Sequence, residues 1–283
     1  MRRSDGRRGL GLALVAIAVS CALGTGQPLR ASPVRPALDP GVQTCLEHLK
    51  EADSEARLLC LGKLKAAGPA AEAAVPALCG ILDQSDGATS HLLVASVLDV
   101  FRSLGPRAAP AAETLSSLLP HRHKLYKDRD KWLVIRLRAY IAVTLSEIGF
   151  PSSALPALLD TLAHTDERTV SMEIGAAVRA AGSLGPRGRE LVPYLLDTLA
   201  LRISEEEFSL ERYEPQFPPN EATTVQLEAV RSLSRIASAE DREVLTALRQ
   251  LADNQGQYEL DPRVVRDARR AVELLQRKHG ERQ

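Results

Sequence analysis

The sequence predicts an all-α fold, a right-handed α-solenoid of about six helix-turn-helix repeats, and two observations lead to that prediction. A Gly-Pro breaker recurs along the chain, and an amphipathic apolar stripe follows each occurrence. The breakers are Gly68-Pro69, Gly105-Pro106, Gly149-Phe150-Pro151 and Gly185-Pro186, at intervals of 37, 44 and 36 residues. A period in this range is typical of arrays in which each repeat contributes one pair of helices.

The stripe after each breaker has the spacing i, i+3, i+4, i+7 of a helix that buries one face. The stripes are Val75, Leu78, Cys79 and Leu82; Ala112, Leu115, Ser116 and Leu119; Leu155, Leu158, Leu159 and Leu162; and Val192, Leu195, Leu196 and Leu199. A second helix follows a polar turn, and glycine ends it because glycine adopts a left-handed conformation at little cost. Proline then opens the next helix, where no N–H donor is needed.

The predicted units are 42–68, 69–105, 106–149, 150–185, 186–237 and 238–279, within a solenoid domain over 42–283. The first helices also carry internal prolines at Pro76, Pro156 and Pro193. The Leu-Gly-Pro breaker, these prolines and the period resemble the HEAT-repeat family, particularly the short bacterial HEAT-like repeats also found in phycobilisome lyase relatives. The resemblance covers about residues 42–279. It implies one alternative function, that of a bilin-lyase-like enzyme or accessory subunit.

The N-terminal residues 1–26 are predicted to be an export signal, because four arginines precede an apolar run over 10–23. That run is shorter than the roughly 20 apolar residues of a membrane-spanning helix. The stretch ending at Cys21 resembles a bacterial lipobox, which implies lipidation of Cys21; the alternative is ordinary cleavage just downstream. A Pro- and Gly-rich linker follows over 27–41. We therefore expect an exported protein, periplasmic or anchored to a bacterial membrane as a lipoprotein.

Catalytic signatures are missing from the sequence, which contains no glycine-rich phosphate loop, zinc-protease motif or serine-hydrolase elbow. Acidic residues are dispersed along the predicted helices, which is typical of solvated faces. His121 and His123 have no third ligand nearby, so we expect neither a metal nor a cofactor. The sequence therefore predicts a protein that is not an enzyme.

The cysteines of the first unit allow two interpretations. Cys45 and Cys60 are placed almost symmetrically about a turn, so they are candidates for a disulfide across the first hairpin in an oxidising compartment. The alternative is that Cys60 and Cys79 are small buried apolar residues.

Two insertions, over 121–132 and 201–220, interrupt the period between the first and second helices of their units. The topology predicts that both lie on the same rim. Their candidate protein-binding residues are Arg122, Lys124 and Trp132 in the basic insertion, and Glu205, Glu206, Glu207, Phe208, Tyr213 and Phe217 in the acidic one. Three interpretations are open: an edge that binds a partner, an internal clasp in which opposite charges pair, and loop growth without function.

An arginine ladder is the basis of a rival hypothesis. Arg138, Arg179, Arg231 and Arg266 fall on the second helices, which are expected to line the inner curve. Such a row is suited to a polyanion such as nucleic acid, unless the arginines pair with acids on neighbouring helices. The formal charge of zero and the export signal disfavour nucleic acid. The preferred prediction is a non-catalytic, exported interaction scaffold whose partner is another protein.

Overall fold

The computed structural model of the chain describes residues 40–50, 53–165, 169–200, 206–213, 216–253 and 260–280, with side chains to 277. The export signal, Cys21 and the linker up to residue 39 lie outside the described residues, as does Glu205. Within the described ranges, no helix combines the length and the apolar character needed to cross a membrane.

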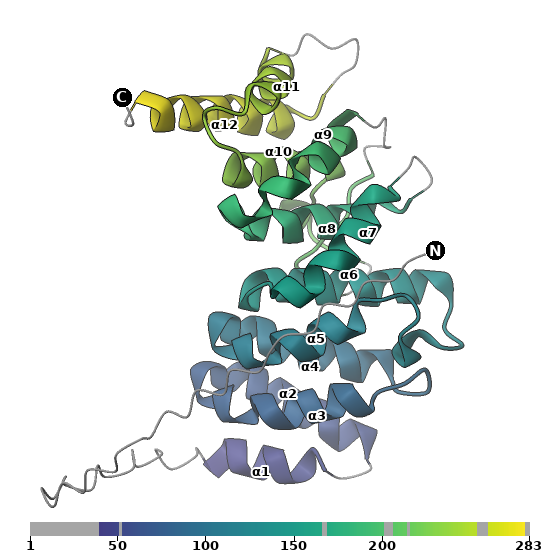
Figure 1. Cartoon of the computed structure of the whole chain (residues 1–283). Helices are drawn as coiled ribbons and strands as arrows, with labels where there is room; N and C mark the ends of the chain where they lie inside the picture. The colour runs from purple at the N-terminus through teal and green to yellow at the C-terminus, as the bar shows by residue number, and fades with distance from the viewer. Residues whose placement is uncertain are drawn as a thin grey trace, which may run out of the picture. The chain divides into compact units, whose positions relative to one another are not determined.

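The described helices form six consecutive helix-turn-helix pairs, which are stacked in chain order (Figure 1). The first helices of the pairs are α1 (Pro40–His48), α3 (Val75–Gln84), α5 (Ala112–Leu118), α7 (Leu155–Ala163), α9 (Val192–Ala200) and α11 (Arg242–Ala252). The second helices are α2 (Ser54–Ala67), α4 (His91–Leu104), α6 (Lys131–Ile148), α8 (Ser171–Ser183), α10 (Val225–Ile236) and α12 (Pro262–Gly280). Each pair matches one predicted unit, except that α1 begins two residues before the first unit and α12 ends one residue after the last. The prediction of an all-α solenoid of about six repeats is therefore confirmed.

The breaker glycines end the second helices as predicted. Gly68, Gly105 and Gly185 have φ values of 54°, 56° and 54°, and Gly149 has a φ of 121°. A Cβ atom at these positions would meet no other atom within 4 Å. Backbone conformation, and not crowding, therefore requires glycine. After Gly68, Gly105 and Gly185 the chain continues into short 3-10 helices, η1 (Gly68–Ala74), η2 (Gly105–Ala111) and η5 (Gly185–Leu191).

One hydrophobic core runs through the stack of pairs. The first-helix stripe buries Leu78, Leu115, Leu158 and Leu195, at 4% exposure or less. The second helices pack on one another in order, from α2 through α4, α6, α8 and α10 to α12. The solvent side of this continuous layer of second helices, termed the second-helix face, carries the polar groups described below.

The cysteines of the first hairpin are buried free thiols. Burial and contact with the Cys60 thiol raise the pKa of Cys45 to about 11. The Cys45 thiol therefore stays protonated and meets Cys60 across the hairpin as a weakly polar group, and the disulfide stays a prediction. Cys79 is half-buried in α3.

Candidate functional site

Residues 206–213 of the acidic insertion, termed the strap, lie across the second-helix face. Phe208 is 3% exposed, and its backbone exchanges hydrogen bonds of 3.1 and 2.9 Å with Thr223. A Cβ atom on Gly175 would lie 2.2 Å from the Phe208 ring. The absence of a side chain at Gly175, in the middle of α8, is therefore what admits the ring.

The carboxylate of Glu211 connects the strap to two second helices that are not neighbours. Arg179 of α8 donates to Glu211 Oε1 at 2.7 Å, and Arg102 of α4 donates to the Glu211 carbonyl oxygen at 2.8 Å. Arg102 also contacts Glu211 Oε2 at 3.3 Å. Contacts of both kinds, to a carboxylate and to a main-chain carbonyl, fix the position of an extended segment.

Both ends of the described strap are held by further arginines. Arg136 of α6 donates to the Tyr213 carbonyl, and its guanidinium lies 4.7 Å from the centroid of the Tyr213 ring. Burial raises the pKa of Tyr213 to about 12, so its phenol stays neutral. At the other end, Arg263 of α12 donates to Glu207 at 2.7 Å. The strap thereby touches α4, α6, α8 and α12.

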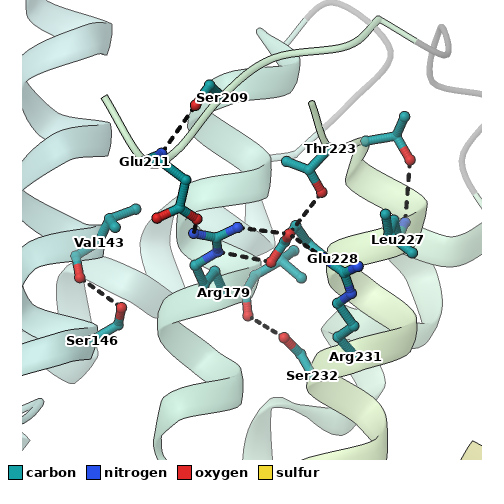
Figure 2. Close-up of polar contacts among 12 residues, drawn as sticks. Val143, Ser146, Arg179, Ser209, Glu211, Thr223, Leu227, Glu228, Arg231 and Ser232 are labelled. Carbon is teal, nitrogen blue, oxygen red and sulfur yellow. Dashed lines mark hydrogen bonds and ion pairs between the residues drawn. The ribbon is translucent and has the colours of Figure 1, made fainter. Parts of the chain in front are cut away.

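Beneath the strap, Arg179 and Glu228 form a buried pair (Figure 2). Arg179 donates twice to the Glu228 carboxylate, at 2.9 Å each, and the Thr223 hydroxyl donates to it at 2.7 Å. Burial alone would raise the pKa of Glu228, but these hydrogen bonds hold it below its ordinary value. Burial alone would lower the pKa of Arg179, but the carboxylates of Glu228 and Glu211 raise it above its ordinary value. The positive charge of Arg179 is thus already met within the chain.

The expected ladder position of Arg138 requires a correction. Arg138 is 5% exposed, donates to the Leu119 carbonyl at 2.9 Å and pairs with Glu173. Counted back from its breaker glycine, Arg138 occupies the same place as the buried residues Val94 and Ile174 in neighbouring repeats. It therefore lies inside its helical pair and not on the second-helix face.

The other ladder arginines do lie on that face, and each contacts an acid. Arg231 and Arg266 share Asp267, at 3.0 and 3.2 Å, and Arg179 pairs with Glu211 and Glu228. These contacts agree with the alternative to polyanion binding, in which the ladder arginines pair with acidic residues of the chain itself. The arginine ladder and the acidic insertion contact each other, because Arg179 of the ladder pairs with Glu211 of the insertion.

The basic insertion docks elsewhere, on the turn that follows α3. Lys124 donates to the Asp83 carbonyl at 2.6 Å, and Arg129 donates to the Asp86 carbonyl at 3.1 Å. Tyr126 is buried and donates to the Leu118 carbonyl at 2.6 Å. Arg122 is exposed, and Trp132 is 62% exposed. Among the ion pairs of the described residues, none joins the two insertions, so the acidic charges of the strap pair with helix arginines instead.

Several candidates of the acidic insertion have modest contacts. Glu206 is exposed and accepts a hydrogen bond from the Ser171 hydroxyl at 3.2 Å, and Phe217 is half-buried. In the part of the chain that the structure describes, no group of three or more His, Cys, Asp or Glu residues is placed to hold a metal ion.

Beside the strap, the second-helix face opens into a groove of about 500 Å³ between α2, α4 and α6. It is lined by Lys65, Leu92, Asp99, Tyr140, Glu211 and Tyr213, among others. Leu92 is 51% exposed, and Lys65 pairs with Asp99 at 2.6 Å. On α2, Leu59 is 63% exposed and occupies the repeat position of Ser96, which also lines the groove. Exposed leucines therefore lie on this face of both α4 and α2.

No model of a known protein family matches the chain, and no curated protein matches its sequence. Among solved structures, an engineered protein is 17% identical with a TM-score of 0.51, over 83% of this chain and 98% of that one. A designed armadillo repeat protein is 18% identical with a TM-score of 0.49, over 83% and 99%. The complex of CpcE and CpcF of phycocyanin lyase from Nostoc sp. contains a chain that is 16% identical with a TM-score of 0.43, over 88% and 100%.

Likeness at these identities concerns the fold alone. Together with the six helical pairs and their glycine breakers, it supports a helical-repeat fold for the part of the chain that the structure describes.

Proposed function

We propose that the chain is a non-catalytic scaffold that binds an extended segment of another protein on its second-helix face. One observation carries the proposal: this face already holds an extended segment, the strap. It seats an aromatic ring at Gly175, a carboxylate between Arg102 and Arg179, and a main-chain carbonyl on Arg136. These are general means of recognising polypeptide, which repeat arrays use on their extended surfaces.

The groove next to the strap supplies the free part of that surface. Its exposed Leu92 and the half-buried ring of Tyr213 provide apolar and aromatic contacts of the kind that anchor protein interfaces. Lys65 and Asp99 at the same groove suit the polar main chain or charged side chains of a partner. The proposed occupant is an extended segment that continues the path of the strap from α4 onto α2.

The absence of catalysis and the location belong to the same proposal. The charged groups of the face, Arg102 with Glu147 and Arg179 with Glu228, are engaged in structural pairs. The export pattern in residues 1–26 supports a partner in the periplasm or at the bacterial envelope.

Site-specific crosslinking tests this proposal. A photoreactive residue at position 92 should crosslink the chain to one protein of the bacterial envelope. The same photoreactive residue at position 250, in place of the exposed Gln250 of α11, should give no crosslink to that protein. With the captured protein purified, Leu92→Asp should weaken its affinity by about tenfold, because a desolvated apolar anchor is replaced by a charge.

Gln250→Asp is the control for that measurement, since it adds the same charge at an exposed position outside the groove. Leu92 lies in the first turn of α4, where an aspartate is favourable for the helix, so a loss of folding is not expected. Equal affinities of the wild-type chain and Leu92→Asp would contradict the proposed function.

A further inference from the structure

A second groove, of about 460 Å³, lies on the second-helix face between α10 and α12. Its lining includes Arg231, Arg235, Arg266, Arg270, Asp267 and Leu274. Four arginines therefore face one another across the last two repeats, with a single carboxylate among the lining residues. Leu274 is 42% exposed and gives the groove an apolar part.

The positive charge of this groove exceeds the negative charge available to it. Asp267 is divided between Arg231 and Arg266, and Glu228, which approaches Arg231 at 3.4 Å, is held by Arg179. Arg235 and Arg270 are exposed, and neither has a hydrogen-bond or ion-pair partner among the described residues. Two guanidinium groups, one from each helix, are thus left to bind an external anion.

Elsewhere on the second-helix face, arginines from two helices bind a carboxylate of the chain itself. Arg179 and Arg102, from two second helices, converge on the Glu211 carboxylate of the strap. Counted back from the end of its repeat, Arg231 occupies the position of Arg179. Guanidinium groups bind carboxylates in paired, directional hydrogen bonds. In the α10–α12 groove, Asp267 meets Arg231 and Arg266, so Arg235 and Arg270 present that chemistry without a carboxylate partner in the part of the chain that the structure describes.

We propose that this groove is a binding site for an acidic polypeptide segment, with glutamate or aspartate side chains on Arg235 and Arg270 and an apolar side chain on Leu274. The site shares no residue with the α2–α6 groove and does not depend on the function proposed for it. Nucleic acid fits less well, because a phosphate backbone needs a row of free cations. Further along the face, Arg102 and Arg179 are already paired.

Fluorescence anisotropy with defined probes tests the site on the full chain. A labelled poly-glutamate peptide should bind, a poly-glutamine peptide of equal length should not, and a DNA duplex should bind more weakly than poly-glutamate. Arg235→Gln with Arg270→Gln should weaken poly-glutamate binding on the order of tenfold, since two charge-assisted contacts are lost. Both residues are exposed, so circular dichroism and thermal unfolding should be unchanged.

The matched control is Arg242→Gln with Arg249→Gln, which removes the same charge from exposed positions on α11. Its effect should stay below about twofold at moderate salt. An equal loss in the control would show that net charge alone attracts the peptide, and tighter binding of DNA would identify a nucleic-acid site; either result overturns the proposal, as does failure of poly-glutamate to bind.

Charge reversal adds an independent readout. Arg235→Glu with Arg270→Glu should bind a poly-lysine peptide that the wild-type chain does not bind, and no gain would contradict the assignment. Leu92→Asp should leave poly-glutamate affinity unchanged, so failure at one groove is distinguishable from failure at the other.

Discussion

The two insertions leave their helical pairs at the same point, after the first helix, and yet they settle on different surfaces. The basic insertion reaches the preceding repeat, where Lys124 contacts the last turn of α3 and Arg129 contacts the turn that follows it. The strap instead crosses to the second-helix face and reaches four helices, with Glu211 bound to α4 and α8.

The sign of the charge explains the difference. The C-terminal end of α3 and the turn after it present main-chain carbonyl groups. Such groups at a helix C-terminus accept hydrogen bonds from the cationic side chains of lysine and arginine. The second-helix face presents the guanidinium groups of Arg102, Arg136 and Arg179, which donate hydrogen bonds to carboxylate and carbonyl oxygens. Insertions at equivalent places are thus sorted by the groups that each surface leaves unpaired.

The largest expected effect comes from removing the aromatic anchor of the strap. Phe208→Ala should lower the free energy of unfolding by about 3–5 kcal/mol, because a fully buried ring leaves a cavity against α8. Urea denaturation measures the loss, and amide hydrogen exchange should show faster exchange at Phe208 and Thr223, whose backbones are paired. Phe217→Ala, at a half-buried site of the same insertion, is the control and should cost less.

A double-mutant cycle isolates the contact with Gly175. In the wild-type chain, Gly175→Ala should destabilise, because the new Cβ would lie 2.2 Å from the Phe208 ring. In the Phe208→Ala background the same change should stabilise by about 1 kcal/mol, the difference in helix propensity between glycine and alanine. A neutral or stabilising Gly175→Ala in the wild-type chain would show that the ring is not seated there.

The second effect concerns the buried carboxylate under the strap. Glu228→Gln should cost about 1–3 kcal/mol at neutral pH, because Arg179 loses its bidentate anionic partner. The folded-state pKa of Glu228 lies below its ordinary value of 4.5. Its charge therefore contributes stability that is complete above that value and is lost as the pH falls through the lower folded pKa.

Urea unfolding of the two proteins at about pH 7 and about pH 3 checks this sign. The gap between wild type and Glu228→Gln should close at the acidic end, whereas Glu243→Gln, at an exposed position on α11, should match the wild type throughout. A gap that widened in acid would refute the assignment.

The repeat architecture was predictable from the sequence because it depends on local rules. Each breaker glycine has a positive φ, and each stripe buries a leucine at its centre, such as Leu78 or Leu195, since helix periodicity and helix termination act over a few residues. The order of the pairs then follows from chain connectivity, which places each repeat on the previous one.

The pairing across the face was not predictable in this way. Arg102 and Glu211 are more than a hundred positions apart, and nothing local indicates that they meet. Arg138 was placed on the face by its helix alone, whereas its register relative to Gly149 puts it with buried residues. One signal was present: Gly175 interrupts a run of good helix formers, which indicates close approach of another segment.

The smallest expected effects distinguish the two insertions by their response to salt. Arg129→Gln removes donors to the Asp86 and Thr89 carbonyls on the α3–α4 turn and to the Leu125 carbonyl within the insertion, and it should cost about 1–2 kcal/mol. Glu211→Gln should cost less, about 0.5–1 kcal/mol, because its side chain is 45% exposed and its ion pairs are partly screened.

Urea unfolding at low and high salt separates these two causes. The cost of Glu211→Gln should shrink as salt rises, because the strap is held through charge pairs that ions screen. The cost of Arg129→Gln should change less, since its acceptors are neutral carbonyl groups whose hydrogen bonds depend on geometry more than on long-range charge. The same salt dependence for both variants would mean that net charge, and not the identity of the acceptors, places the two insertions on their different surfaces.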